Sequence, residues 1–197
     1  MEKIVLASNN MHKVKEFKEI LNNVEILTLK EIGFDKEIIE DGLTFYENSL
    51  IKAKTVGTYL KEKGLNYPVL ADDSGLVVEE LNGAPGVYSA RYAGERATDK
   101  ENREKLLNEL SGKTNRKAHF SCVIVKYFSD GNHVCGTGET YGEILEREVG
   151  YDGFGYDCLF YSEDLKKSFG EATAEEKNSV SHRSRAIKNL IEVESNM

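Results

Sequence analysis

The pattern of apolar and polar positions predicts a strand, a turn and a helix at the start of the chain. Residues 4–7 are apolar throughout, which is typical of a short buried strand. Ser8-Asn9-Asn10 is a polar turn, and apolar residues then recur at helical spacing at Val14, Phe17, Ile20 and Leu21. The pattern therefore predicts a helix from about Met11 to Leu21, followed by a second strand at Val24–Leu29.

Three later helix starts are marked by Ser/Thr-x-x-Glu sequences, in which the first side chain and the glutamate cap the helix reciprocally. They are Thr44–Glu47, Thr98–Glu101 and Thr173–Glu176. The first predicts a helix that carries Lys52 and ends at Gly64, and the second predicts one that closes near Ser111-Gly112. Ser181–Arg185 is expected to open the last helix.

Two strands joined by a tight turn interrupt this alternation of strands and helices. Ala118–Phe128 and His133–Thr140 are strand-like, and Ser129–Asn132 between them is typical of a hairpin turn. A further apolar strand is expected at Cys158–Tyr161. Because an antiparallel hairpin lies within a βαβ pattern, we expect an α/β fold with a mixed sheet.

The segment Val69–Leu76 joins an apolar run to two adjacent carboxylates, a hydroxyl and a glycine. It predicts a buried strand that ends at Asp72-Asp73-Ser74-Gly75. Acids at the end of a strand are placed where open α/β proteins carry out chemistry, and they could serve a metal ion, a proton or both. The alternative is an Asp/Ser/Gly turn without any function.

Cations occupy the first turns of two predicted helices, where the helix dipole disfavours them unless an anion is near. Lys13 follows Ser8–Asn10, so this segment could hold a phosphate, although Ser8 or Asn10 could simply cap the helix. His182 and Arg183 repeat the arrangement in the last helix. Phe154 and Tyr156, set among glycines, could stack on a flat ligand or pack in a core turn.

Composition limits the classes of function. The 197 residues show no linker or repeat, and 40% are apolar, so one domain is expected. A formal net charge of −8 argues against a long nucleic-acid footprint but not against one triphosphate held by a few cations and a metal. Three widely spaced cysteines support neither a disulfide framework nor a zinc ribbon. Only four consecutive apolar residues occur near the N-terminus, too few for a signal peptide or a spanning helix, so we expect a cytoplasmic protein with no membrane partner.

Six segments together resemble the successive signatures of the non-canonical purine nucleoside triphosphate pyrophosphatase (inosine triphosphatase) family. They follow the family's order over residues 4–190: Ser8–Lys13, Glu40–Asn48, Ala71–Leu76, Gly83–Gly94, Gly153–Asp157 and Ser181–Arg183. Each segment is moderately specific, and the six together are highly specific.

The resemblance implies Mg²⁺-dependent hydrolysis of ITP, dITP and XTP to the monophosphate and pyrophosphate, which would clear deaminated purines from the nucleotide pool. It also implies an elongated two-lobed fold around a long twisted mixed sheet with flanking helices. Residues 1–197 would then form a single domain with a nucleotide cleft between the lobes. The family is typically homodimeric.

Site roles carried over from the family fall into three groups. Asp73 would be the general base and a metal ligand, with Glu40 as the second metal ligand and Asp72 in support. The triphosphate would be held by Ser8, Asn9, Asn10, Met11, His12, Lys13, Lys52 and Ser74. The base and sugar would be held by Phe154, Gly155, Tyr156, Asp157, Lys177, His182 and Arg183.

Two other functions stay open on the sequence. A related pyrophosphatase for modified pyrimidine or methylated nucleotides would keep the metal and phosphate groups but change the base pocket. A non-catalytic nucleotide sensor would bind ITP without turnover.

Overall fold

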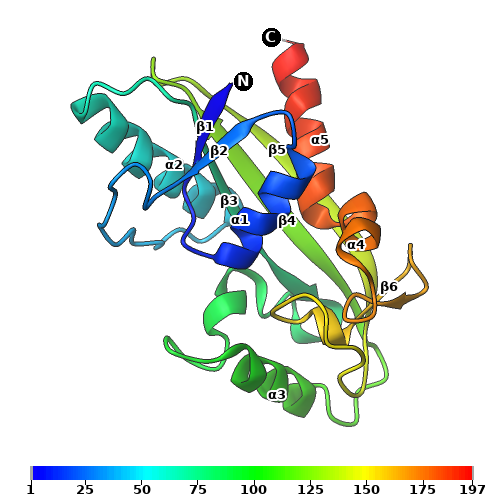
Figure 1. Ribbon diagram of the computed structural model, residues 1–197. Helices are drawn as coiled ribbons and strands as arrows, with labels where there is room; N and C mark the ends of the chain where they lie inside the picture. The colour runs from blue at the N-terminus through cyan, green and yellow to red at the C-terminus, as the bar shows by residue number, and fades with distance from the viewer. Residues whose placement is uncertain (1, 197) are drawn as a thin grey trace. The chain divides into compact units, whose positions relative to one another are not determined.

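The computed structural model describes residues 2–196, and seven strands form its mixed sheet (Figure 1). The strand order is β2-β1-β3-β4-β5-β6-β7. The strands are β1 (Lys3–Leu6), β2 (Glu25–Thr28), β3 (Val69–Val78), β4 (Lys117–Tyr127), β5 (His133–Ile144), β6 (Phe160–Ser162) and β7 (Lys167–Ser168). Strand β1 pairs in parallel with β2 and β3, whereas β6 pairs antiparallel with β5 and β7. The predicted mixed sheet is therefore confirmed.

The α-helices are α1 (Met11–Ile20), α2 (Phe45–Glu62), α3 (Asp99–Glu109), α4 (Ala174–Val180) and α5 (His182–Ser195). Short 3-10 helices occupy Glu79–Leu81, Gly86–Arg91 and Asp157–Leu159. All three predicted capping boxes form, at the starts of α2, α3 and α4. None of the helices within residues 2–196 is both long enough and apolar enough to cross a membrane.

The chain divides into two compact units, each built from separate stretches of sequence. Unit 1 comprises the described residues through Asp73, then Cys122–Thr137 and the described residues from Ala186 onward. Unit 2 comprises Ser74–Ser121 and Gly138–Arg185. Because β3, β4, β5 and α5 each pass from one unit into the other, the sequence contains no linker that would mark the division.

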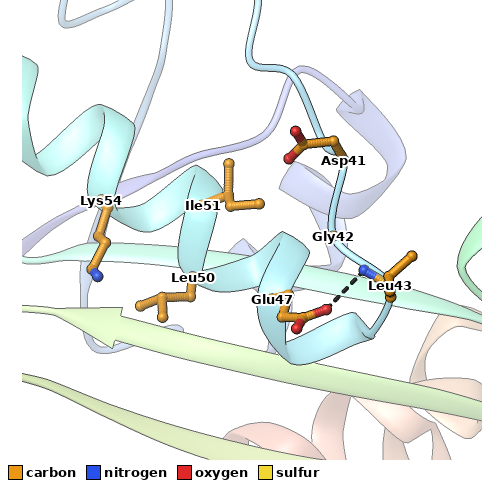
Figure 2. A pocket seen from close by; sticks show the side chains of 7 residues that line it. All are labelled: Asp41, Gly42, Leu43, Glu47, Leu50, Ile51 and Lys54. Carbon is orange, nitrogen blue, oxygen red and sulfur yellow. Dashed lines mark hydrogen bonds between the residues drawn. The ribbon is translucent and has the colours of Figure 1, made fainter.

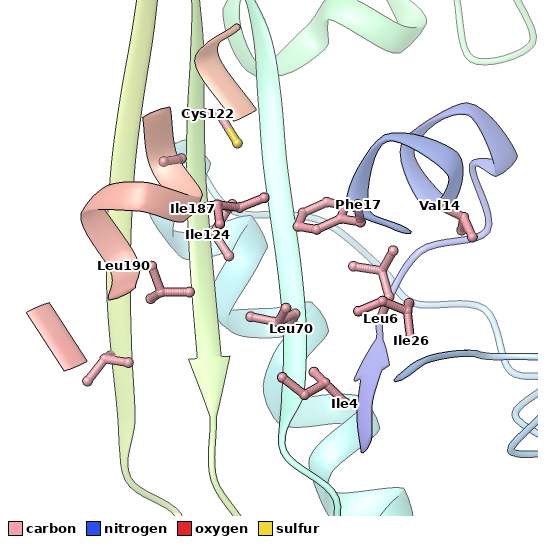
Figure 3. Packing of buried hydrophobic residues seen from close by; sticks show 12 residues of the cluster. Ile4, Leu6, Val14, Phe17, Ile26, Leu70, Cys122, Ile124, Ile187 and Leu190 are labelled. Carbon is pink, nitrogen blue, oxygen red and sulfur yellow. The ribbon is translucent and has the colours of Figure 1, made fainter. Parts of the chain in front are cut away.

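Unit 1 has helices on both faces of its strands. One face carries Leu6 and Leu70, which pack with Phe17 of α1 and Ile187 of α5 (Figure 3). The other face has the alternate strand residues, and there the core is completed by α2. This second cluster consists of Val5, Ala7, Leu29, Phe34, Ala53, Val56, Leu60, Val69, Ala71 and Val125. The alternation of buried residues along each strand thus decides which helix a strand residue meets.

A close approach of β5 to α5 fixes one side of unit 1. A Cβ atom on Gly136 would lie 2.4 Å from the Ala186 carbonyl oxygen and 2.5 Å from the Leu190 nitrogen. Real Cβ atoms essentially never approach backbone so closely, so only glycine allows the strand to lie directly on the helix backbone.

Unit 2 has its own apolar core, which includes Leu106 of α3 and Leu110, the residue that caps the end of this helix. Aromatic rings make up much of the rest: Phe120, Phe160 and Phe169 contact one another, with ring centroids 4.8 Å (Phe120–Phe160), 6.2 Å (Phe120–Phe169) and 5.0 Å (Phe160–Phe169) apart. This core lies beneath the glycine-rich turn that precedes β6, because Tyr156 belongs to the same cluster.

Three predicted strand boundaries were wrong, and one of them is the end of β5, predicted at Thr140 but found at Ile144. Strand β3 does not end at Asp72 but continues through the acids to Val78, so no Asp/Ser/Gly turn exists there. The strand continues because Leu76 and Val78 are buried beyond the acids and because both carboxylates have lysine partners. The strand predicted at Cys158–Tyr161 begins only at Phe160, since residues 157–159 form a 3-10 turn.

Candidate active site

The segment between β1 and α1 is organised by its own side chains. The Asn10 side chain caps α1 by accepting hydrogen bonds from the backbone N–H groups of His12 (3.0 Å) and Lys13 (3.2 Å), while Ser8 Oγ accepts from Asn10 N–H at 3.2 Å. The capping role expected for Asn10 is therefore confirmed. Asn9, Met11 and His12 are exposed. The phosphate-binding role of this segment stays a prediction.

Lys13 has an acidic partner inside unit 1. Its Nζ lies 2.9 Å from Asp72 Oδ2, and the two side chains are 15% and 0% exposed. The carboxylate offsets the unfavourable position of a cation near a helix N-terminus. Asp72 thus holds the lysine that is predicted to meet phosphate, which is compatible with the supporting role that the family resemblance implied for it.

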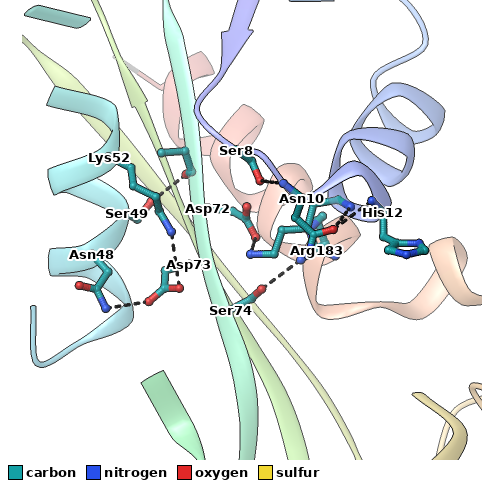
Figure 4. A network of polar contacts seen from close by, with 12 residues as sticks. Ser8, Asn10, His12, Asn48, Ser49, Lys52, Asp72, Asp73, Ser74 and Arg183 are labelled. Carbon is teal, nitrogen blue, oxygen red and sulfur yellow. Dashed lines mark hydrogen bonds and ion pairs between the residues drawn. The ribbon is translucent and has the colours of Figure 1, made fainter. Parts of the chain in front are cut away.

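Asp73 lies on the opposite face of β3, toward α2. Asn48 Nδ2 donates a hydrogen bond to Asp73 Oδ2 at 3.1 Å, and Lys52 Nζ lies 3.6 Å from Oδ1 (Figure 4). Burial raises the pKa of the Asp73 carboxyl above its ordinary value, although Lys52, Lys13 and the Asn48 amide act in the opposite direction. A carboxylate whose pKa is raised is a stronger proton acceptor than an ordinary carboxylate.

Glu40 meets the same lysine from the loop before α2. Lys52 Nζ donates a hydrogen bond to Glu40 Oε2 at 2.5 Å, so one ammonium lies between the carboxylates of Glu40 and Asp73. Burial by itself would lower the pKa of Lys52, but these carboxylates outweigh it and the pKa is raised. The two acids predicted to share a metal are therefore brought together around a cation.

The donor set fits Mg²⁺. Magnesium prefers oxygen ligands and is usually bound through one or two carboxylates together with substrate phosphates and water. Glu40 and Asp73 supply two carboxylates that already face one positive charge. Within residues 2–196, no group of three or more His, Cys, Asp or Glu side chains could hold a metal ion by itself.

Sequence reasoning missed the role of Asn48, which is 1% exposed. Its Oδ1 accepts a hydrogen bond from Gly42 N–H at 2.9 Å while its Nδ2 bonds to Asp73, so the amide links the Glu40 loop to the strand. A Cβ atom on Gly42 would lie 2.7 Å from Asn48 Oδ1, which explains the glycine. The usable signal was spacing, since Asn48 and Lys52 are polar residues one helical turn apart.

Helix α2 is itself anchored through Ser49, which is fully buried. Its Oγ donates to the Ala71 carbonyl at 2.7 Å and accepts from Val125 N–H at 3.2 Å. Strands β3 and β4 therefore fix the position of α2 along the sheet, and with it the positions of Asn48 and Lys52 beside β3.

A cavity of about 360 Å³ lies beside the start of α2. It is lined by Asp41, Gly42, Leu43, Glu47, Leu50, Ile51 and Lys54 (Figure 2). The Glu47 carboxylate accepts from Leu43 N–H at 2.7 Å and holds the loop against the helix. None of the predicted site residues lines this cavity.

Unit 2 contains the residues predicted for the base and sugar. In the turn before β6, the Asp157 carboxylate accepts hydrogen bonds from Phe154 N–H at 2.8 Å and from Lys177 Nζ at 2.6 Å. The same ammonium lies 4.8 Å from the centroid of the Phe154 ring. Asp157 and Lys177 thus fix the turn and the ring, and both are buried.

His182 and Arg183 begin α5, next to Ser181, whose Oγ accepts from Ser184 N–H at 3.2 Å. The His182 ring stacks on Phe120, with centroids 4.9 Å apart and planes 16° apart. Arg183 is 1% exposed and donates from Nη2 to Ser74 Oγ at 3.0 Å (Figure 4). The structure therefore joins Ser74, predicted at phosphate, to Arg183, predicted at the base.

The sequence matches the Ham1 family over residues 4–193. A Clostridium perfringens protein named dITP/XTP pyrophosphatase is 53% identical over 195 residues, which cover 96% of each chain. A Bacillus subtilis protein of the same name is 45% identical over 194 residues, with 96% of each chain covered. The solved structure of the Staphylococcus aureus Ham1 protein is 42% identical, covers 100% of both chains and gives a TM-score of 0.85. The predicted family resemblance is confirmed, and the chain belongs to the Ham1 family.

Proposed function

We propose that this protein is a nucleoside triphosphate pyrophosphohydrolase that converts dITP, XTP and ITP into the monophosphate and pyrophosphate. The observation that carries the proposal is the placement of two carboxylates, Glu40 and Asp73, around the Lys52 ammonium in a Ham1 chain. Relatives that are 43–53% identical bear the name dITP/XTP pyrophosphatase. The reaction would remove deaminated purine nucleotides before polymerases use them.

Glu40 and Asp73 would hold Mg²⁺. When bound, the ion supplies neutralisation of triphosphate oxygens and polarisation of the attacking water.

Asp73 is proposed as the general base. Its carboxylate would orient a water molecule and accept its proton while the water oxygen bonds to the α-phosphorus. The bond between the α-phosphorus and the bridging oxygen breaks, and pyrophosphate leaves with the electron pair. Asn48, which donates to Asp73 Oδ2, would keep the carboxylate oriented.

Lys13 and Lys52 would stabilise the negative charge that builds up on the departing pyrophosphate. The backbone and side chains of the segment Ser8–Lys13, together with Ser74, complete the proposed triphosphate contacts. The positive end of a helix dipole suits anions, and the first turn of α1 contains no acidic residue.

Selectivity for deaminated purines requires hydrogen-bond donors that face O6, because the amino group of adenine would then meet a donor. Leaving such groups unpaired discriminates by about 1–3 kcal/mol for each lost hydrogen bond. His182, Arg183 and the backbone of Phe154–Asp157 are the proposed donors, with Lys177 as their support.

We also propose that the enzyme is a cytoplasmic homodimer. The assembly rests on the family resemblance, and the compartment on the use of the nucleotide pool by polymerases. Light scattering on the purified protein tests the assembly directly.

Product analysis tests the reaction. The purified protein is given ITP, dITP, XTP, dUTP and the standard triphosphates with Mg²⁺, and pyrophosphate and orthophosphate are measured separately. We expect pyrophosphate and monophosphate, with the deaminated purines as preferred substrates. Faster turnover of dUTP would favour a pyrimidine pyrophosphatase, and release of orthophosphate would exclude attack at the α-phosphorus. Tight binding of ITP without turnover would identify a sensor.

A further inference from the structure

Gly155 stands at the centre of the turn before β6, in a left-handed conformation with φ of +60°. A Cβ atom there would meet nothing within 4 Å, so the backbone conformation, and not space, requires the glycine. A glycine in this region can rotate its flanking peptide groups at little cost. Such a rotation would exchange a donor N–H for an acceptor C=O at the same position.

Helix α3 holds both polar groups of Gly155. Asp99 Oδ2 accepts a hydrogen bond from Gly155 N–H at 2.8 Å, and Arg103 Nη1 donates to the Gly155 carbonyl at 2.9 Å. The two side chains are four residues apart and therefore lie on one face of the helix. Arg103 Nε also donates to Glu148 at 2.7 Å, which fixes the plane of the guanidinium.

The two contacts act on different peptide groups. The Gly155 N–H belongs to the peptide that joins it to Phe154, and its carbonyl belongs to the peptide that joins it to Tyr156. From inside the turn, Asp157 N–H donates to the Phe154 carbonyl at 3.1 Å. The orientation of the backbone edge beside the Phe154 ring therefore depends on α3 as well as on the turn itself.

We propose that Asp99 and Arg103 are positioning residues for base selectivity: they hold the N–H and carbonyl of Gly155 toward α3, so that the Tyr156 N–H, which is opposite that carbonyl in the same peptide, faces a 6-oxopurine as a donor. The inference rests on the proposed function, because it assigns this backbone to the base. Neither side chain needs to touch the nucleotide. A rotated peptide would present its carbonyl oxygen instead, which repels O6 of a 6-oxopurine but accepts a hydrogen bond from the amino group of adenine.

The test compares dITP with dATP in four variants. Asp99→Ala removes the acceptor, and Arg103→Met removes the donor but keeps the aliphatic stem. We expect each to lower the ratio of kcat/KM for dITP over dATP roughly tenfold, the effect of one misdirected hydrogen bond to the base. Asp99→Asn keeps an acceptor oxygen and should retain most of the ratio. Lys100→Ala breaks the exposed Lys100–Glu104 pair on the same helix and should leave the ratio unchanged.

Amide hydrogen exchange at Gly155 and calorimetric affinities for both nucleotides accompany the kinetics. Faster exchange in Asp99→Ala together with a lower ratio supports the proposal. An unchanged ratio overturns it, even if thermal stability falls, because a merely structural role weakens both nucleotides equally. If the wild type binds dITP without hydrolysing it, the proposed function fails. The ratio of the affinities for dITP and dATP still decides whether Asp99 and Arg103 position the base contacts. If the wild type binds neither nucleotide, both proposals fail.

Discussion

Asp72 and Asp73 are neighbours with separate partners, because consecutive residues of a strand face opposite sides. Asp72 shares its face with Leu70 and meets Lys13 of α1. Asp73 shares its face with Ala71 and meets α2. A strand that ends at Asp72 would give the two acids no opposite faces, so the sequence pattern does not separate them, although the family resemblance distinguishes their roles.

Replacing Asp73 tests the proposed base. Asp73→Asn should lower kcat by about 10²–10⁴-fold, the usual contribution of a positioned proton acceptor, and by more if a metal ligand is lost as well. Steady-state pyrophosphate release from dITP measures the effect. Asp41→Asn, an exposed acid one residue after Glu40, serves as the control and should keep kcat. Retention of most activity by Asp73→Asn would assign the proton to another group.

The same variant should not destabilise the fold. Burial raises the pKa of Asp73, so the folded state is more stable with Asp73 protonated than with Asp73 ionised. The free energy of unfolding therefore falls as the pH rises through the pKa of Asp73 in the folded state. In metal-free buffer, Asp73→Asn should therefore gain Tm relative to the wild type between acidic and neutral pH. Lys52 keeps Glu40 as its partner. A variant less stable than the wild type at neutral pH would show that the attraction to Lys52 outweighs burial.

Lys13→Ala separates ligand binding from stability. Removing the lysine should raise the KM for dITP, and it should also cost about 3 kcal/mol because the Asp72 carboxylate stays buried without the ammonium. Urea unfolding and kinetics measure the two effects. In the double variant Lys13→Ala/Asp72→Asn, stability should largely return while the KM stays high. An unchanged KM in both variants would remove Lys13 from the triphosphate site.

At the scale of elements, the sequence predicted the helix starts better than the strand ends. Capping chemistry is local, so Thr44 with Glu47 places the first turn of α2 without reference to the rest of the fold. The length of β3 depends on tertiary contacts, since Asp72 and Asp73 become tolerable inside a strand only when lysines from two helices meet them. The link from Asn48 to Gly42 likewise joins residues through a loop whose path no local pattern specifies.

Two variants near the start of α2 compare loss of the link to Asp73 with loss of the helix cap. Asn48→Ala breaks the link between the Glu40 loop and Asp73, so it should lower kcat about tenfold or more by misplacing a proposed metal ligand. Thr44→Ala removes the cap of the same helix and should cost about 1 kcal/mol of stability with little change in kcat. Thermal unfolding and dITP turnover compare them. Equal losses of kcat in the two variants would reduce Asn48 to a stabilising role.

At the scale of the whole molecule, the two units share continuous elements. Strand β3 leaves unit 1 at Asp73 and enters unit 2 at Ser74 without a break, and β4, β5 and α5 also cross the division. The sequence suggested one domain because it shows no linker, and the interleaving of the two units explains why. A nucleotide cleft between two lobes stays a prediction.

Shared strands predict that the chain unfolds in one cooperative transition, since neither unit can lose its strand segments without disturbing the other. Leu110→Ala, in the unit 2 core, should cost about 2–5 kcal/mol. Two native cysteines report on the units separately, because Cys122 is buried in unit 1 and Cys158 in unit 2. Thiol labelling across a urea series, read by mass spectrometry, should give both cysteines the same midpoint in the wild type.

In Leu110→Ala, both midpoints should fall together. Cys135, which is partly exposed, provides the control for labelling of the native state. Burial raises the pKa of the Cys158 thiol and slows its reaction in the folded protein. Labelling of Cys158 therefore reports the unfolding that exposes its thiol. A midpoint for Cys158 that falls while that of Cys122 stays fixed would show that unit 2 unfolds alone, and the strands would then have to break at the Asp73–Ser74 junction.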